Sequence, residues 1–591
     1  MMNDTVFEEL LMRFKTERAP RADAFTSTAA FTADLITGIR TERRKHNSKI
    51  RQYIAELRKL ALKQRNTPAS ANVLADCCAM PSASPSVSYS IPAKACRPAS
   101  AMFREQMSMD LGMIDDSAPA FDTEEYKTVG ERPFVETAAN PRSTFGADVD
   151  TAMYANLRRM VMDEHRLPPA DAVRIEELLN YFNYDYPLPE GDAVLRPDFE
   201  MGAAPWAPER KLLLIGVQAK APVPEELPPS HYVFLIDNSG SMYGVFPMVK
   251  TAMTTLAKQL RPVDRVSLVT YGGDVKVLLE GCADIDTVCR KIARLDAEGC
   301  TPGGEGIQAA YRLAEEHFIP GGNNRIVLVT DGDFNVGVSS EAELVGMVKA
   351  KRDTGICLTV VGCGMGNYKD NKVKMLANKG NGNYFYIDGE REAKRVFVHG
   401  LTGNMYALAR DVKFQIEFNP EQVFAYRLIG YELRDMADRD FRDDRKESGT
   451  VGLGQQVTAL YELIPADASD EVKDAAVGTQ PLKYVTPKTN GGDELLTFRI
   501  RWKKPHGNAA AREDCTSVKP PLSKTENWGW AAAVAEFGLA LRKSKFAPEA
   551  TFDHAAKEAQ QHLGEDKNGD RAEFLLLVRR AAELRRDRKK K

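Results

Sequence analysis

Between residues 230 and 402 the sequence alternates short apolar runs with stretches that have helical spacing. The apolar runs are rich in Val, Ile, Leu and Tyr and lie at 232–237, 265–271, 325–331, 357–362 and 384–388. Continuous apolar strands separated by helices are typical of a mostly parallel sheet that is covered on both faces. The pattern therefore predicts an α/β fold with a doubly wound, mostly parallel, Rossmann-like sheet. Ligands of such sheets bind at the carboxyl ends of the strands.

The rest of the 591-residue chain divides into flanking segments. Residues 1–66 hold 14 Lys and Arg against 8 Asp and Glu and favour a basic helical segment, which is either a solvated helix or a helix for a partner or membrane surface. Residues 67–125 are rich in Ser, Ala and Pro and favour a disordered linker. We expect α+β and β modules beside the central domain at 230–402, and terminal helices. The remaining expected boundaries are 135–229 for an N-terminal module, 411–503 for an antiparallel β module and 524–591 for a C-terminal helical region.

Composition excludes several classes of protein. The formal net charge of −3 argues against nucleic acid as the main partner. No apolar stretch is long enough for a transmembrane segment, and no secretory signal precedes the first charged residues. None of the nine cysteines forms a Cys-x-x-Cys pair, which argues against structural zinc and favours a reducing compartment. These features predict a cytoplasmic location.

Oxygen-bearing side chains follow two of the apolar runs and precede one helix. Asp237, Ser239 and Ser241 come directly after the run at 232–237, Thr301 precedes a Gly-rich helix start, and Asp331 ends the run at 325–331. In a parallel sheet these three loops would emerge at the same edge. Carboxylate, hydroxyl and water oxygens suit a hard cation, here Mg2+ or alternatively Mn2+ or Ca2+. The simplest alternative for the first loop is a helix N-cap turn.

The motifs resemble two related families. Asp-x-Ser-x-Ser, the threonine before the Gly-rich helix and Thr-Asp-Gly after an inner strand resemble the metal-ion-dependent adhesion site (MIDAS) of von Willebrand factor type A (VWFA) domains. Over roughly 135–580 the chain is similar to the bacterial YfbK-type family, through Asn140-Pro-x-Ser-Thr-Phe, Arg174-Ile-Glu-Glu-Leu-Leu-Asn-Tyr-Phe and Tyr426-Arg-Leu-Ile-Gly-Tyr-Glu. Many relatives in that family look like exported lipoproteins, which leaves the location open.

The VWFA resemblance implies a ligand set for the metal. Asp237, Ser239 and Ser241 would supply the first loop, Thr301 the second, and Asp331 the third, directly or through water. One direct carboxylate and hydroxyls leave a divalent ion short of negative charge. We therefore expect a protein partner that presents Glu or Asp to complete the metal shell, and a binding module for adhesion or scaffolding rather than an enzyme.

A metal-dependent phosphoester hydrolase or phosphotransferase is the alternative. A strand that ends in Asp and a later Thr-Asp-Gly-Asp are features of haloacid-dehalogenase-like enzymes, but those enzymes need a second Asp two residues after the first, where this chain has Ser239. Neither Ser239 nor Ser241 lies in a Gly-x-Ser-x-Gly elbow, and no partner histidine is identifiable. A structural protein with an idle site is the third alternative.

Further acidic clusters have simpler explanations than metal binding. We interpret Asp333 as a turn residue, Asp148 and Asp150 as capping or turn residues, and the cluster at 440–444 as a solvated turn. The stretch from Asp566 to Asp570 is similar to the start of an EF-hand loop, but Arg571 and Leu577 stand where Gly and Glu are needed. It therefore predicts an interhelical turn.

Overall fold

The structure is a computed structural model. It describes residues 130–147, 150–272, 274–297, 303–331, 341–363, 370–477, 492–505 and 510–590. The chain forms two compact units, Met1–Ser117 and Ala118–Lys591, and all described residues belong to the second. The basic helical segment predicted at 1–66 and the linker predicted at 67–125 lie outside the described residues.

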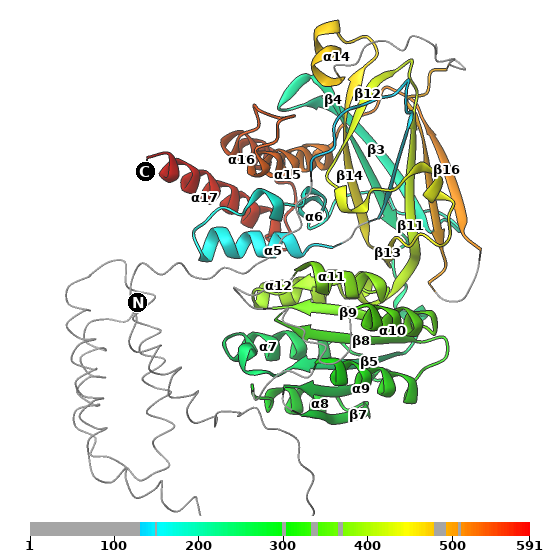
Figure 1. The fold of residues 1–591 in the computed structure, drawn as a ribbon, viewed down its shortest axis with the longest axis vertical. Coiled ribbons are helices and arrows are strands. Elements are labelled where there is room, and N and C mark those ends of the chain that lie inside the picture. The colour runs from blue at the N-terminus through cyan, green and yellow to red at the C-terminus, as the bar shows by residue number, and fades with distance from the viewer. Residues whose placement is uncertain are drawn as a thin grey trace, which may run out of the picture. The chain divides into compact units, whose positions relative to one another are not determined.

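The central domain contains a six-stranded sheet in the order β10-β9-β8-β5-β6-β7 (Figure 1). All neighbours pair in parallel except β6 and β7, which are antiparallel. The strands are β5 (Ser230–Asp237), β6 (Arg265–Tyr271), β7 (Val275–Cys282), β8 (Asn323–Thr330), β9 (Ile356–Gly362) and β10 (Tyr384–Tyr386). The helices are α7 (Phe246–Ala257), α8 (Ile285–Ala293), α9 (Gly303–Glu316), α10 (Glu341–Asp353), α11 (Asp370–Lys379) and α12 (Glu390–Lys394). The predicted doubly wound, mostly parallel α/β sheet is confirmed.

The side chains of β5 explain why helices cover both faces of this sheet. Successive strand residues point to opposite faces. Tyr232, Phe234 and Ile236 lie in one core cluster with α7, α8 and α12, whereas Val233 and Leu235 lie in another with α9, α10 and α11. All eight residues of β5, and all eight of β8, are buried. Side chains within these strands are therefore shielded from solvent, and a ligand can be reached only from the loops that follow the strand ends.

Two further sheets, paired throughout in antiparallel fashion, form the flanking body. One has the order β1-β12-β14-β4-β3 and the other β13-β11-β15-β16, with β2 also paired to β11 (Figure 1). The strands are β1 (Val135–Glu136), β2 (Arg142–Gly146), β3 (Leu195–Ala204), β4 (Ala207–Ala219), β11 (Ala407–Phe418), β12 (Val423–Ile429), β13 (Gly449–Gly452), β14 (Gln456–Pro465), β15 (Leu496–Lys503) and β16 (Arg512–Val518). Both sheets combine strands from before and after the central domain.

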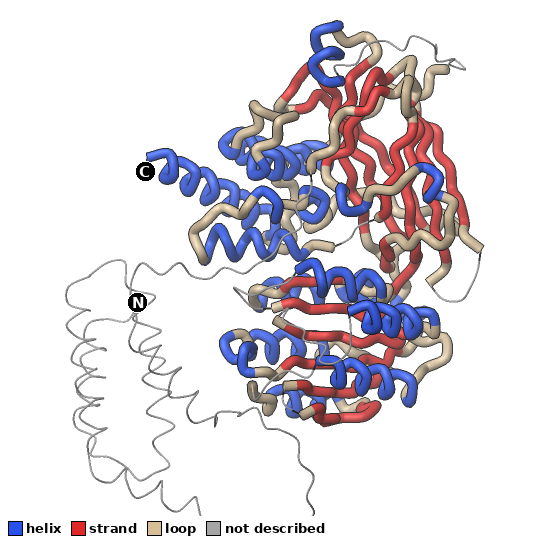
Figure 2. Tube along the Cα trace, in the orientation of Figure 1, coloured by secondary structure: helices blue, strands red, loops and turns tan. Residues whose placement is uncertain are grey.

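Alternation along β4 places this body's two cores. Leu213, Ile215 and Val217 lie in the core shared by the two sheets, whereas Leu212 and Leu214 lie in a core with helices. Figure 2 shows these helices beside the strands of the flanking body. The α-helices of the flanking body are α5 (Ala152–Arg158), α6 (Ile175–Leu179), α13 (Leu401–Met405), α14 (Asp470–Val477), α15 (Glu526–Arg542), α16 (Phe552–Gln561) and α17 (Asp570–Lys590). The shorter turns are η4 (Arg159–Asp163), η5 (Ala170–Ala172), η6 (Pro224–Glu226), η7 (Gly240–Gly244), η8 (Arg395–His399), η9 (Glu432–Arg434) and η10 (Asp438–Phe441). No helix in the described part of the chain is both long and apolar enough to cross a membrane.

Two predicted helices differ from the observed ones. The spacing of apolar residues from Leu167 to Phe182 favours one continuous helix, but the α-helix is confined to α6, because Val173 and Arg174 adopt extended backbone. The side chain of Arg174 pairs with buried Glu177 at 3.2 Å, a tertiary contact that local spacing does not reveal. The spacing of apolar residues over 390–401 likewise favours one helix, but it changes to the π-helical turn η8 at Arg395.

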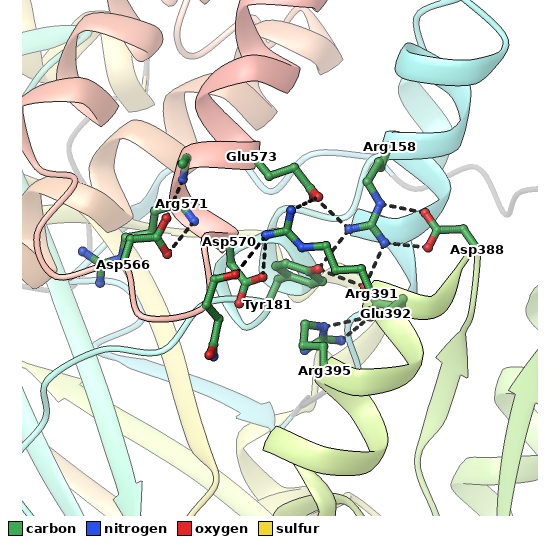
Figure 3. A network of polar contacts seen from close by, with 12 residues as sticks. Arg158, Tyr181, Asp388, Arg391, Glu392, Arg395, Asp566, Asp570, Arg571 and Glu573 are labelled. Carbon is green, nitrogen blue, oxygen red and sulfur yellow. Dashed lines mark hydrogen bonds and ion pairs between the residues drawn. The ribbon is translucent and has the colours of Figure 1, made fainter. Parts of the chain in front are cut away.

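A buried polar network joins the flanking helices to the last helix of the central domain (Figure 3). Arg158, at the end of α5, lies 2.6 Å from Asp388 Oδ1, 2.9 Å from Glu392 Oε2 and 2.8 Å from Glu573 Oε1. The hydroxyl of Tyr181 donates to Glu392 at 2.9 Å. The four parts of the chain that meet here are thus held by charge as well as by apolar packing.

Candidate metal centre

The first loop gathers three oxygen-bearing side chains after β5. The backbone N–H of Ser239 donates to Asp237 Oδ1 at 2.9 Å, and the hydroxyls of Ser239 and Ser241 lie 3.1 Å apart. The turn η7 follows, anchored by buried Met242, whose N–H donates to the Ser239 carbonyl at 3.1 Å. A short Asp or Ser side chain that accepts a nearby backbone N–H favours such a turn.

Exposure changes sharply along this loop. Asp237 is 0% exposed and Ser239 is 2% exposed, whereas Ser241 is exposed. The loop therefore runs from a buried carboxylate to a hydroxyl at the surface. A ligand on these oxygens would be held from inside the domain and would remain accessible from the Ser241 side.

The carboxylate of Asp237 lies in an unfavourable environment for a charge. Its Oδ2 atom is buried and has no hydrogen-bond partner among the described residues. Burial and, to a smaller extent, the nearby charge of Asp331 raise the pKa of Asp237 to about 6, against the opposing effect of the hydrogen bonds from Ser239. A buried carboxylate close to a second one is stabilised by a cation between them.

The third loop reaches the same edge of the sheet. Strand β8 pairs with β5 in parallel, with Ile236 opposite Val329, so Thr330 and Asp331 follow beside Asp237. Burial raises the pKa values of Tyr271 and Cys363, and the charge of Asp331 raises both further. Asp331 thus lies close to the ends of β5, β6 and β9.

The second loop is only partly described. Thr301 lies outside the described residues, but α9 begins at Gly303 and packs against β5, β6 and β8. The structure therefore brings together Asp237, Ser239 and Ser241, with Asp331 beside them, and describes no position for Thr301. These donors fit a hard cation, because they are oxygen atoms of carboxylates and hydroxyls. No cluster of three or more His, Cys, Asp and Glu side chains suited to a metal occurs among the described residues.

The contacts of Ser239 and His231 do not match what the enzyme alternative requires around Asp237. Ser239 takes the place of a second aspartate and bonds to Asp237 through its own backbone. His231 lies at the opposite end of β5, where its Nε2 atom is 3.0 Å from the Ser267 hydroxyl. Ser239 therefore does not supply the aspartate that such an enzyme needs two residues after Asp237, and His231 does not lie beside Asp237 as a base.

Neighbouring residues that sequence reasoning missed support the first loop. The backbone N–H of Asn238 donates to the Tyr271 carbonyl at 3.2 Å. A Cβ atom on Gly272 would lie 2.5 Å from the Asn238 carbonyl carbon, and one on Gly306 would lie 2.9 Å from the Tyr271 Cβ. Glycines at the end of a strand and in the first turn of a helix are the available signal, because glycine permits close backbone approach.

Asp148 and Asp333 lie outside the described residues, and the remaining members of the acidic clusters have structural partners. Asp150 was expected to cap α5, but it accepts from the Tyr384 N–H at 3.3 Å and pairs with Lys374 at 3.1 Å. Asp150 is buried, and its carboxylate is paired with a lysine from α11. It therefore stabilises a tertiary contact and does not cap α5. Lys413 donates to the carbonyls of Asp440 and Asp443, within the turn predicted at that position. Asp566 accepts from two backbone N–H groups at the start of α17, which confirms the predicted interhelical turn.

Comparison with known proteins connects the fold and the site. The matching family models are described as von Willebrand factor type A domain at residues 232–333, von Willebrand factor at 120–214, and Uncharacterized protein YfbK, C-terminal at 403–584. The chain is 38% identical over 479 residues to the uncharacterized protein YfbK of Escherichia coli K12, covering 77% of this chain and 80% of that protein. An uncharacterized protein of Synechocystis is 29% identical over 196 residues, covering 32% of this chain and 44% of that protein.

Solved structures include a von Willebrand factor type A protein from Catenulispora acidiphila. It has a TM-score of 0.36 and 14% sequence identity, covering 65% of this chain and 89% of that chain. The identity to Escherichia coli YfbK extends over most of both proteins, and the family models match on both sides of the central domain. The chain therefore belongs to the YfbK family and carries a von Willebrand factor type A domain at its centre.

Proposed function

We propose that this protein is a metal-dependent protein-binding module, in which Mg2+ at the edge of the central sheet is completed by a carboxylate from a partner protein. Von Willebrand factor type A domains typically mediate interactions between proteins. The proposed ligands are Asp237, Ser239 and Ser241, with Thr301 and Asp331 from the other loops. Mn2+ or Ca2+ would serve the same oxygen donors.

The observation that carries the proposal is the unpartnered, buried Oδ2 atom of Asp237. Leaving a charged oxygen without a partner costs free energy, and a bound cation removes that cost. Asp331 contributes a second negative charge at the same edge. With two carboxylates on the protein, the ion's remaining positions are open to water or to an acidic side chain.

The accessible side of the site supports a protein as the completing ligand. Ser241 is exposed, as are Gly240, Tyr243 and Gly244 in the turn that follows. Tyr243 is 79% exposed, and an exposed aromatic ring next to a charged site is typical of protein interfaces. A Glu or Asp on the partner would add a negatively charged ligand to the cation, and the surrounding loops would determine which partner binds.

Calorimetric titration with MgCl2 tests the metal site. We expect the wild type to bind Mg2+ and Asp237→Asn to lose measurable binding, because the amide supplies no negative charge. The matched control is Asp296→Asn, since Asp296 is 78% exposed and pairs with Lys250 at 3.3 Å. Without metal, Asp237→Asn should melt at or above the wild-type temperature, because it removes a buried charge. Absence of binding by wild type to Mg2+, Mn2+ and Ca2+ would refute the proposal.

A second experiment tests the partner's carboxylate. The full chain is immobilised, proteins are captured in Mg2+, and those released by a chelator are identified. Each acidic residue at the captured partner's surface is then changed to its amide. The proposal predicts one position at which this change weakens Mg2+-dependent binding at least tenfold. Unchanged binding of every such partner variant contradicts it.

A further inference from the structure

A row of buried side chains lies beneath the candidate metal centre. Tyr271 ends β6 and stands opposite Asp237 in the parallel register, and Thr330 ends β8 on the other side of Asp237. All three residues are buried, each with an exposed fraction of 0%. The three residues therefore form a continuous floor across the ends of β6, β5 and β8.

The side chains of this floor share one face of the sheet. Val269 and Tyr271 lie in the same core cluster as Val233 and Leu235, the face covered by α9. Because side chains alternate along a strand, Asp237 has the same orientation as Val233 and Leu235. The ring of Tyr271 and the carboxylate of Asp237 are thus neighbours on the α9 side of the sheet.

Tyr271 also contacts both loops on either side of it. Its carbonyl accepts from the N–H of Asn238, inside the first loop. Its side chain lies under the first turn of α9, where a Cβ atom on Gly306 would come within 2.9 Å of the Tyr271 Cβ and 3.0 Å of its Cγ. That close approach sets the distance between Tyr271 and the first turn of α9. The second loop leads directly into that turn.

We propose that Tyr271 is a positioning residue for the metal centre, which holds the Asp237 carboxylate in place and sets the position of the α9 start above it. This inference rests on the proposed function. The parallel register and the shared face place the Tyr271 side chain directly beside the buried Asp237 carboxylate. A residue that orients a metal ligand without touching the metal commonly changes affinity by tenfold or more when altered.

Two substitutions separate positioning from general packing. Tyr271→Phe keeps the ring and removes only the hydroxyl, and we expect it to weaken Mg2+ affinity by about tenfold. The control is Tyr311→Phe, which removes the hydroxyl of another fully buried tyrosine, on α9 and in the same core cluster. The control should bind Mg2+ as the wild type does.

A second pair tests the α9 start. Gly306→Ala forces its new Cβ against Tyr271, and we expect it also to weaken Mg2+ binding. The matched control is Gly346→Ala, in α10, where nothing lies within 4 Å of an added Cβ. Gly346→Ala should leave Mg2+ affinity unchanged and raise stability slightly, since alanine favours a helix.

The probe in each case is Mg2+ alone, titrated by calorimetry into the full chain, with the metal-free melting temperature as the second readout. Weaker Mg2+ binding by Tyr271→Phe at an unchanged metal-free melting temperature, with Tyr311→Phe as wild type, supports the inference. Wild-type affinity in Tyr271→Phe, or equal weakening in Tyr311→Phe, overturns it while the proposed function stands. Failure of the wild type to bind Mg2+ overturns both.

Discussion

Single residues in this protein show how burial decides chemical behaviour. His231 is the second residue of the strand that Asp237 ends, and both are 0% exposed. Burial, together with the neighbouring His317, lowers the pKa of His231 to about 4. The Ser267 hydroxyl lies 3.0 Å from its Nε2 and also accepts the Gly281 N–H, so the histidine is held as a neutral ring. The sequence places both residues on one strand, but only the packing around them makes one neutral and the other a candidate ligand.

His231 predicts a loss of stability in mild acid. Its native pKa lies below the ordinary value of about 6.5, so the unfolded chain takes up this proton first as pH falls. The contribution to the free energy of unfolding is complete above pH 6.5 and is lost as pH falls towards 4. At about 1.4 kcal/mol for each pH unit between the two pKa values, the full loss is about 3 kcal/mol.

Urea unfolding at pH 7.5 and pH 5.0 measures this effect. His231→Gln should lose less stability between the two pH values than the wild type, because glutamine does not titrate. The exposed His399 provides the control, and His399→Gln should follow the wild-type pH dependence. Equal pH dependence in His231→Gln and wild type would show that the buried histidine contributes nothing.

At the scale of elements, strand positions followed from local pattern and helix details did not. The apolar runs predicted β5, β6, β8, β9 and β10 of the central sheet to within two residues at each end, because buried strands read as unbroken hydrophobic sequence. Helix α8 was not predicted, since its apolar face consists of little more than Val288 and Ile292. The π-helical turns η4 and η8 were also missed. Each adjoins a residue of the network in Figure 3, Arg158 or Arg395, so tertiary pairing accompanies the change of helix type.

The Arg158 network predicts a large loss of stability when its cation is removed. The side chain of Glu392 is 2% exposed, and although burial raises its pKa, Arg395 and Arg158 hold that pKa below the usual range. Arg158→Met keeps a long apolar side chain but leaves Asp388 and Glu392 with less positive charge around them. Breaking such a buried pair on one side costs roughly 3–5 kcal/mol, which urea unfolding measures.

An exposed ion pair on α12, the helix that carries Glu392, is the control for this substitution. Lys394 and Glu390 are 56% and 63% exposed and lie 2.7 Å apart. Lys394→Met should cost less than about 1 kcal/mol, because water already screens the pair. A similar cost for Arg158→Met and Lys394→Met would mean that burial does not strengthen the network.

At the scale of the whole described body, distant parts of the chain build common sheets. Strand β4 pairs with β14, and β2 pairs with β11, so the segments before and after the central domain fold together. Buried ion pairs then join that body to the central domain, as Lys374 with Glu177 at 2.6 Å shows. Dividing the chain into consecutive modules separates these paired segments, because strand pairing between residues more than 200 positions apart leaves no local sequence pattern.

This connectivity predicts that Mg2+ stabilises parts of the protein far from the proposed site. All four tryptophans lie in the flanking body, at Trp206, Trp502, Trp528 and Trp530. If the body and the central domain unfold together, tryptophan fluorescence should report a higher unfolding midpoint in saturating Mg2+. The expected gain is about 2.7 kcal/mol at a Mg2+ concentration one hundred times its dissociation constant.

Fluorescence and far-UV circular dichroism, recorded on the same thermal melts, provide the measurement. Coincident transitions that both move with Mg2+ are the expected result, and Asp237→Asn should remove the shift. Two separate transitions, with only the dichroism step responding to Mg2+, would show that the central domain unfolds independently.

The sequence by itself determined the central sheet, the order of its strands along the chain, and the placement of Asp237 and Asp331 after two of them. Apolar periodicity carries that information because each strand and helix must bury its own side chains. Only the tertiary structure decided which strands are neighbours in the flanking body, which carboxylate oxygen of Asp237 is left without a described partner, and which tyrosine lies beneath it. Those outcomes depend on contacts between residues distant in the chain, where the free energy of burial and pairing acts on positions that no local pattern relates.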